Sequence, residues 1–114
     1  MIVYLSGPIS GNPDFRETFA KAKKDLEDKG GVQVINPAVL ADIATPCALD
    51  YEDYMSLDEA LIRRADTLLL LPGWQKSPGC NRELGFAEAL GKTVYEYSEI
   101  GGRHFGAFKG WRPL

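Results

Sequence analysis

Short apolar runs alternate along the chain with longer segments of helical periodicity, and this alternation is the feature that most limits the possible folds. The runs favour β-structure and occupy residues 2–5, 32–35, 67–71 and 93–96. The run at 67–71 does not alternate polar and apolar residues, which is typical of a strand covered on both faces. Strand–helix alternation of this kind predicts one α/β domain with a doubly wound, flavodoxin- or Rossmann-like parallel sheet of four to five strands, flanked by helices.

Three segments show the 3.6-residue spacing of a helix that packs against a sheet. The first is expected to have Pro13 at its first helical position and to end at Gly30-Gly31. The second begins at Tyr51, and the third follows a Ser-Pro-Gly loop at 77–79. The side chains expected to face inward are Phe15, Phe19, Ala22 and Leu26, then Tyr54, Leu57 or Asp58, Leu61 and Ala65, then Leu84, Ala87 and Leu90.

Two other segments are harder to interpret. Residues 38–43 have the composition of a short helix, which Thr45-Pro46 would end. Residues 98–114 are rich in glycine and basic side chains and show no clear period. We therefore predict an α/β domain over 1–97 and leave 98–114 as a C-terminal tail of unassigned structure.

Charge and composition narrow the class of protein. The 114 residues include 13 basic and 16 acidic ones, for a net charge of −3, and contain no Lys/Arg run, so a nucleic-acid partner is not expected. No apolar stretch approaches a membrane span, and the chain opens on a strand in place of a cleavable leader, so we expect a cytoplasmic protein without a membrane partner.

Cys47 and Cys80 have no metal-site or disulfide spacing. His104 is the only histidine, which excludes a metal site built on two or three histidines and leaves a His-based nucleophile triad dependent on the tail.

Two turns follow neighbouring strands of the predicted sheet and are rich in Gly, Ser and Pro. They span 6–12 and 72–82. In doubly wound sheets, ligands bind beyond the carboxyl ends of the strands, where such turns lie. The first offers backbone N–H groups and hydroxyls ahead of a helix, as an anion or sugar site would, although a plain structural turn is the favoured explanation of this motif taken alone. It is neither a P-loop nor a dinucleotide fingerprint.

Three acidic residues near these turns have both a structural and a chemical interpretation. Glu83, early in the third helix, either complements the helix dipole or projects back over the loop. Asp58 lies either on a solvated helix face or beside the same loop, and Asp66 is equally a cap or a turn residue. Two carboxylates at neighbouring strand ends would fit glycosidic chemistry, one attacking an anomeric carbon and one handling a proton. Trp74 is either packed at a strand end or placed to stack on a base.

With these residues identified, the sequence resembles the nucleoside 2-deoxyribosyltransferase-like superfamily over about residues 1–97. The resemblance rests on Tyr-Leu-Ser-Gly-Pro-Ile at 4–9, on Ala65-Asp66 ahead of the third strand, and on the Gly-x3-Glu-Leu-Gly-x-Ala-x-Ala-x-Gly-Lys motif at 79–92. It is strongest to the small members, which include deoxynucleoside-monophosphate N-glycosidases and short phage or bacterial proteins.

The resemblance implies a role for each matched residue. Glu83 would be the nucleophile that attacks C1′ of the sugar, Tyr4 would hold its carboxylate, and Asp58 would manage the proton of the departing base. Ser77 stands where the nucleoside transferases carry an acid and the monophosphate hydrolases a serine, which favours a 5′-monophosphate because a hydroxyl donates to phosphate. The expected substrate contacts are Gly7, Ile9, Ser10, Gly11, Ser77 and Gly79.

The chain also departs from the pattern of the monophosphate hydrolases. Ser10 stands where they tend to carry an arginine, which affects base recognition. They complete the phosphate site with a serine from a partner subunit, for which the tail offers no clear match, although Arg103 or Lys109 could serve.

The leading hypothesis from the sequence is a hydrolase of the N-glycosidic bond of a (deoxy)nucleoside 5′-monophosphate, with no metal or redox cofactor. The alternatives are a deoxyribosyltransferase, in which a second base replaces water, and a catalytically inactive nucleotide-binding module. The family's sites lie near dimer interfaces, so we expect a homodimer, with exposed apolar residues of the helix at 51–65 as the contact.

Overall fold

The computed structural model describes residues 1–28, 30–42, 49–97 and 111–113. Its regular elements alternate along the chain as the sequence predicts. In order they are β1 (Ile2–Ser6), α1 (Phe15–Glu27), β2 (Gln33–Ile35), the 3-10 helix η1 (Pro37–Asp42), α2 (Tyr51–Arg64), β3 (Thr67–Leu70), the 3-10 helix η2 (Trp74–Lys76), α3 (Pro78–Ala89), β4 (Thr93–Tyr97) and β5 (Trp111–Pro113).

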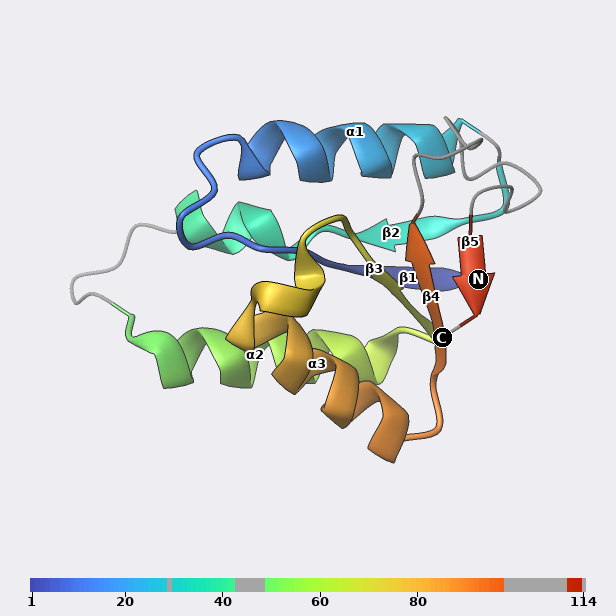
Figure 1. Ribbon diagram of the computed structural model, residues 1–114. Helices are drawn as coiled ribbons and strands as arrows, with labels where there is room; N and C mark the ends of the chain where they lie inside the picture. The colour runs from blue at the N-terminus through green and yellow to red at the C-terminus, as the bar shows by residue number, and fades with distance from the viewer. Residues whose placement is uncertain (29, 43–48, 98–110, 114) are drawn as a thin grey trace.

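The strands form one sheet in the order β2-β1-β3-β4-β5. β1 to β4 are parallel, and β5 runs antiparallel to β4 with Trp111 opposite Tyr97. Helix α1 covers one face of the sheet, while α2 and α3 cover the other (Figure 1). The predicted doubly wound α/β fold is therefore confirmed. Because β1 lies between β2 and β3, the order reverses there, and the gap beyond the ends of β1 and β3 is where such sheets bind ligands.

The alternation of side chains along β1 divides the core into two clusters. Val3 and Leu5 point toward α1, whereas Tyr4 points toward α2 and α3. The α1 cluster adds Phe19, Ala22, Leu26, Ala38, Leu69 and Leu71, and the opposite cluster adds Ile62, Ala65, Leu68, Leu70, Ala87 and Val94. All of β3 is buried, as its unalternating apolar run predicts. Ser6, two residues after Tyr4, lies on the same face and is also fully buried.

The start of α1 differs from the prediction. The helix begins at Phe15 with Asp14 as its N-cap residue, so Pro13 lies outside the helix. The side chain of Asn12 accepts a hydrogen bond from the Asp14 N–H at 3.3 Å, and the Asn12 carbonyl accepts one from Phe15 N at 3.2 Å. This asparagine turn occupies the two residues that the Pro-first pattern assigned to the helix.

The inward faces of α2 and α3 also correct two details. In α2, Asp58 is half-buried while Leu57 is 39% exposed, so of the two alternatives the acid is the one that faces inward. In α3, the buried positions are Cys80, Glu83 and Ala87. Leu90 was expected to face inward and is 44% exposed, because the helix ends at Ala89 and Leu90 is already its C-cap.

Several predictions fall on residues outside the described ranges. They concern Ile43, Thr45-Pro46, Cys47, Arg103, His104 and Lys109. The tail that showed no period supplies the short strand β5. Across the described residues, no helix has both the length and the apolar character needed to cross a bilayer.

Candidate active site

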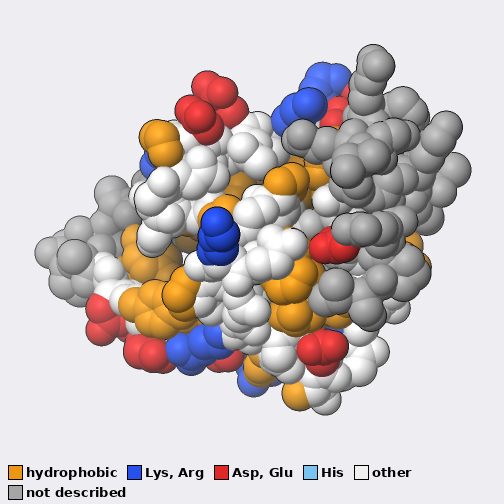
Figure 2. Space-filling view, in the orientation of Figure 1, with side chains coloured by type: hydrophobic (Ala, Val, Ile, Leu, Met, Phe, Trp, Pro, Cys, Tyr) orange, Lys and Arg blue, Asp and Glu red, His pale blue; other side chains and the backbone are white. Residues whose placement is uncertain are grey.

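A cavity of about 590 Å³ lies at the carboxyl ends of β1 and β3. Both turns singled out in the sequence line it, the first through residues 7–10 and the second through Gly73 and residues 76–80. Asp58 and Glu83 line it too, and α2 contributes Tyr51, Tyr54 and Met55. In Figure 2, hydrophobic side chains gather around a hollow on the left of the molecule, and acidic side chains lie along its lower edge, over the start of α2.

Glu83 is a buried acid with a hydroxyl group on each of its oxygens. Its side chain is 6% exposed. The Tyr4 hydroxyl donates to Oε2, and the Ser6 hydroxyl donates to Oε1 at 2.7 Å. Glu83 lies beyond the first turn of α3, on its inward face. A surface acid that complements the helix dipole would need neither burial nor these partners, so the dipole alone does not explain Glu83.

The position of Glu83 follows from how α3 begins. Ser77 is the N-cap, and its Oγ accepts a hydrogen bond from Cys80 N at 3.2 Å, while Pro78 occupies the first helical position. A helix started at this point brings Cys80 and Glu83 onto the face that meets β1. Because Tyr4 and Ser6 are two residues apart on one strand, both hydroxyls reach the same carboxylate.

Burial is the main influence on the titration of both acids, and each acid also affects the pKa of the other. Burial raises the pKa of Glu83 to about 8; the Tyr4 hydrogen bond acts against this rise, the charge of Asp58 adds to it, and the Ser6 bond acts against it. Burial also raises the pKa of Asp58, while its contacts with Glu83 and Tyr4 oppose the rise. Two carboxyl groups coupled in this way titrate as a pair that holds one proton near neutral pH.

The Tyr4 hydroxyl and the Cys80 thiol stay neutral in this range. Burial is the main reason that the pKa of Tyr4 is raised well above its ordinary value, and the Glu83 carboxylate adds to the effect. Burial also raises the pKa of Cys80. Tyr4 is therefore a permanent hydrogen-bond donor to Glu83, and Cys80 a thiol in the wall of the cavity.

Two of the glycines predicted to contact substrate have different structural explanations. A Cβ at Gly7 would come within 3.1 Å of Leu71 and Phe19, so packing alone favours glycine there. A Cβ at Gly79 would meet only Ser77 Oγ at 3.8 Å and Met55 Sδ at 4.0 Å. Neither packing nor a positive φ therefore requires glycine at 79, and its small size leaves room in the cavity.

The other predicted residues are divided between the cavity and its surroundings. Ile9, Ser10 and Ser77 line the cavity, and Gly11 lies in the turn outside its lining with φ +75°. Asp66 is a turn residue, because its carboxylate accepts hydrogen bonds from Ile2 N at 2.9 Å and from the Thr67 hydroxyl at 2.8 Å.

Trp74 does not stack over the cavity. It packs against the core cluster of α2 and α3, and its indole N–H donates to Glu96 Oε2 at 3.1 Å.

Two residues with an evident role were missed in the sequence. Ser6 was grouped with a glycine-rich turn, although the period-2 rule places it on the face of Tyr4. Lys76 lines the cavity directly before the N-cap of α3 and is the one basic side chain in the described lining. The sequence feature that could have identified Lys76 is a basic residue directly before the Ser-Pro-Gly start of a helix. Within the described ranges, no group of three or more potential metal ligands occurs.

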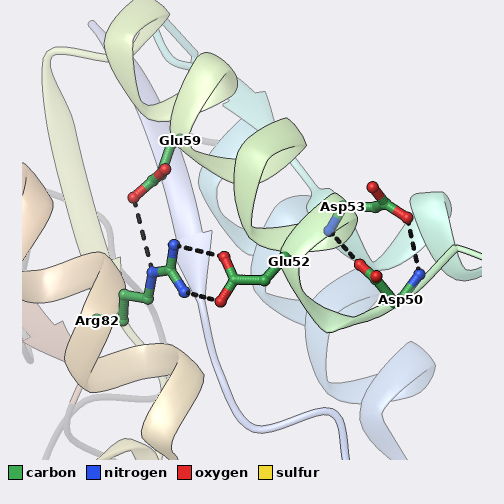
Figure 3. A network of polar contacts seen from close by, with 5 residues as sticks. All are labelled: Asp50, Glu52, Asp53, Glu59 and Arg82. Atoms are coloured by element: carbon green, nitrogen blue, oxygen red, sulfur yellow. Dashed lines mark hydrogen bonds and ion pairs between the residues drawn. The ribbon is translucent and has the colours of Figure 1, made fainter.

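The helices that carry the two acids are joined at the rim of the cavity. Helix α2 begins with a reciprocal capping box, in which Asp50 accepts from Asp53 N at 2.8 Å and Asp53 accepts from Asp50 N at 2.9 Å. Arg82 of α3 forms two parallel hydrogen bonds to Glu52 (Figure 3). The first half of α2 is thereby fixed both at its end and against α3.

Comparison with known proteins places the chain in a family. A family model described as a domain of unknown function (DUF4406) matches residues 1–96. No curated protein matches the sequence.

Solved structures with this fold include two 2-deoxyribosyltransferases. The one from Leishmania mexicana has a TM-score of 0.64 at 22% identity over 85% of this chain and 63% of that chain. The one from Bacillus psychrosaccharolyticus has a TM-score of 0.69 at 24% identity over 90% and 75%. A conserved protein from Enterococcus faecalis V583 has a TM-score of 0.70 at 22% identity over 87% and 64%. The chain thus spans slightly less than two thirds of the Leishmania and Enterococcus proteins.

These likenesses show that the chain shares its fold with two solved 2-deoxyribosyltransferases, and this is the fold that the predicted resemblance implies. The chain belongs to the DUF4406 family, whose sequence here builds a deoxyribosyltransferase-like α/β fold around a buried Tyr–Glu pair.

Proposed function

We propose that the protein hydrolyses the N-glycosidic bond of a nucleoside 5′-monophosphate, releasing the free base and the sugar phosphate. The observation that carries this proposal is Glu83, a buried carboxylate oriented by two hydroxyl donors and facing a cavity beside a second acid. A merely structural acid would not be expected at a cavity wall with a raised pKa. The volume of about 590 Å³ is in the range of small-molecule sites.

The proposed reaction has two steps. Ionised Glu83 attacks C1′ of the sugar, the C1′–N bond breaks, and the base leaves with the bonding electrons and takes the proton held by Asp58. A water molecule then attacks C1′, gives a proton back to Asp58, and releases Glu83 as a carboxylate. The reaction starts from the protonation state in which Glu83 is ionised and the proton of the pair lies on Asp58. The hydrogen bonds from Tyr4 and Ser6 favour this state, while burial, which raises the pKa of Glu83 to about 8, opposes it.

A phosphate at the 5′ position is supported by the start of α3, which lines the cavity. Ser77 Oγ accepts from Cys80 N and keeps its own proton for a ligand oxygen. Gly79 leaves space beside it, and Lys76 supplies a positive charge. Because Asp58 and Glu83 would repel an anion beside them, the start of α3, where Lys76 lies, is the favourable place for a phosphate.

Transfer of the sugar to a second base is the other candidate activity, and the similarity to solved 2-deoxyribosyltransferases favours it. The same Glu83 chemistry serves both reactions, and they differ in whether water or a base resolves the glycosyl–enzyme. The predicted homodimer stays a prediction. Of the apolar residues expected to form its contact, Tyr51 and Leu57 are exposed.

The test is incubation with a panel of nucleoside 5′-monophosphates and free nucleosides, with and without a second base, followed by chromatography of the bases. The proposal expects base release from a monophosphate by the wild type and none by Glu83→Gln. Exchange of bases without net release would support transfer instead. Binding of a nucleotide without any release would indicate a binding protein.

A further inference from the structure

One guanidinium joins the two helices that carry the acids. Arg82 Nη1 and Nη2 donate to Oε1 and Oε2 of Glu52 at 2.9 and 3.0 Å, and Arg82 Nε lies 3.8 Å from Oε2 of Glu59 (Figure 3). The guanidinium also lies 5.9 Å from the centre of the Tyr51 ring. Two parallel hydrogen bonds fix the orientation of their partners as well as the distance, which a single ion pair does not.

The residues of this junction are sequence neighbours of the two acids. Arg82 directly precedes Glu83 on α3, and Glu59 directly follows Asp58 on α2. A shift or rotation of α2 against α3 at Arg82 therefore also moves Asp58 relative to Glu83, because each acid is next in sequence to a residue of the junction.

The two halves of α2 are held in different ways. In the second half, Ile62 is fully buried and Leu61 packs against the core cluster beneath the sheet. In the first half, Met55 is the buried side chain, and it lines the cavity. Neither described core cluster includes a side chain from residues 51–60. The first half of α2 is thus a cavity wall with little core packing of its own, and the Arg82–Glu52 pair connects it to α3.

We propose that Arg82 is a positioning residue of the candidate active site, whose paired hydrogen bonds to Glu52 hold Asp58 at a fixed distance and angle from Glu83. Arg82 is not part of the cavity lining, so it acts through α2 and not on the substrate. The importance of this geometry for catalysis rests on the proposed function, but the geometry itself can be tested without turnover.

Replacing Arg82 by lysine separates positioning from simple charge. Lysine keeps the positive charge and loses the planar fork. If the fork positions α2, its loss lets water reach the acids and separates them, so the pKa of Glu83 falls from about 8 toward the ordinary range. If only the charge matters, Arg82→Lys changes nothing, and removing the charge in Arg82→Met raises the pKa.

The groups that face Glu83 come from three elements and are unchanged in these variants. They are Tyr4 from β1, Asp58 from α2 and Cys80 from α3, with Lys76 in the same cavity lining. Arg63→Lys is the matched control. Its guanidinium on α2 lies 5.2 Å from the ring centre of Phe86 on α3, so it bridges the same two helices away from the acids.

The experiment is a titration of ¹³C-labelled glutamate side chains by NMR on the full chain without substrate, with the Glu83 resonance assigned by its loss in Glu83→Gln. We expect Arg82→Lys to lower the Glu83 midpoint by about one pH unit or more, and Arg63→Lys to leave it unchanged. Glu52→Gln breaks the same pair from α2. In the double variant that combines Arg82→Lys and Glu52→Gln, the Glu83 midpoint should shift no further than in the single variant with the larger shift. If the two residues acted as independent charges, their shifts would add.

A folded Arg82→Lys protein with an unchanged or raised Glu83 midpoint would overturn the inference. The pH profile of base release provides the second readout, in which the same variant moves the limb governed by Glu83 to lower pH. If the wild type releases no base, the proposed function fails while the titration still decides the role of Arg82. If base release persists in wild type and variant with identical profiles, positioning by Arg82 fails and the proposed function stands.

Discussion

Removing the Tyr4 hydroxyl tests the central feature of the site, which is the orientation and ionisation of Glu83. Tyr4→Phe keeps the fully buried ring and deletes only the donor to Oε2. A hydrogen bond to a charged acceptor contributes about 1.5–3 kcal/mol. At 1.36 kcal/mol for each pKa unit, its loss raises the pKa of Glu83 by roughly one to two units. The sign is fixed by the structure, since the Tyr4 bond lowers this pKa.

The assay is the pH dependence of base release, measured as kcat/KM. The limb of the profile that reports ionisation of the nucleophile should move to higher pH by about one to two units, and the rate at pH 7 should fall by roughly ten- to a hundredfold. Ser6→Ala removes the donor to the other oxygen and should move the limb in the same direction. A Tyr4→Phe profile that stays in place, or moves to lower pH, would refute the assignment of Tyr4 as the group that stabilises the Glu83 carboxylate.

Three further predictions concern stability and substrate. Because the folded pKa of Glu83 lies above its ordinary value of 4.5, the protein loses stability as pH rises from 4.5 to about 8. The difference between these two pKa values, at 1.36 kcal/mol per unit, sets the loss of stability at up to about 5 kcal/mol. In Glu83→Gln, the melting temperature should therefore depend less on pH across this range. A pH dependence as steep as that of the wild type would exclude Glu83 as its origin. Lys76→Ala should raise KM for a monophosphate by roughly tenfold, which is the effect of one lost charged contact. The kinetics on the matching free nucleoside should stay unchanged. An equal rise in KM for both substrates would argue against phosphate recognition by Lys76. Gly7→Ala should destabilise the fold by about 1–3 kcal/mol in chemical denaturation because it overpacks Leu71 and Phe19, whereas Gly79→Ala should leave stability nearly intact and weaken nucleotide binding in calorimetry.

The sheet and its helices could be predicted because periodicity is a local property. The four parallel strands lie within a residue or two of the apolar runs, and Phe19, Ala22 and Leu26 form the inward face of α1. The failures have local causes as well. Leu90 continues the helical period of α3 in the sequence, but the helix ends at Ala89. Leu90 is its C-cap and is exposed. The strand at 111–113 is three residues long, too short to show alternation, and is specified by its pairing with β4.

The candidate site could be predicted in its parts more easily than in its arrangement. The motif around Glu83 pointed to a reactive acid, yet from the local sequence Asp58 had an equally good explanation as a solvated residue. What brings the two together is the packing of α2 against α3, through contacts such as Arg82 with Glu52, which are 30 residues apart. No pattern within a single helix contains that information. Lys76 was missed for a similar reason, since the turn of η2 decides where its side chain lies.

The placement of Glu83 shows how the fold and the site depend on the same strand. In β1, the odd positions Val3 and Leu5 fill the core under α1, while the even positions Tyr4 and Ser6 present their hydroxyls to α3. A strand buried on both faces tolerates apolar side chains at any of these positions, so phenylalanine and alanine at 4 and 6 would suit the sheet at least as well. Two fully buried hydroxyls are therefore not explained by stability of the sheet. They are accounted for by the carboxylate between them, and that carboxylate by the cavity it faces.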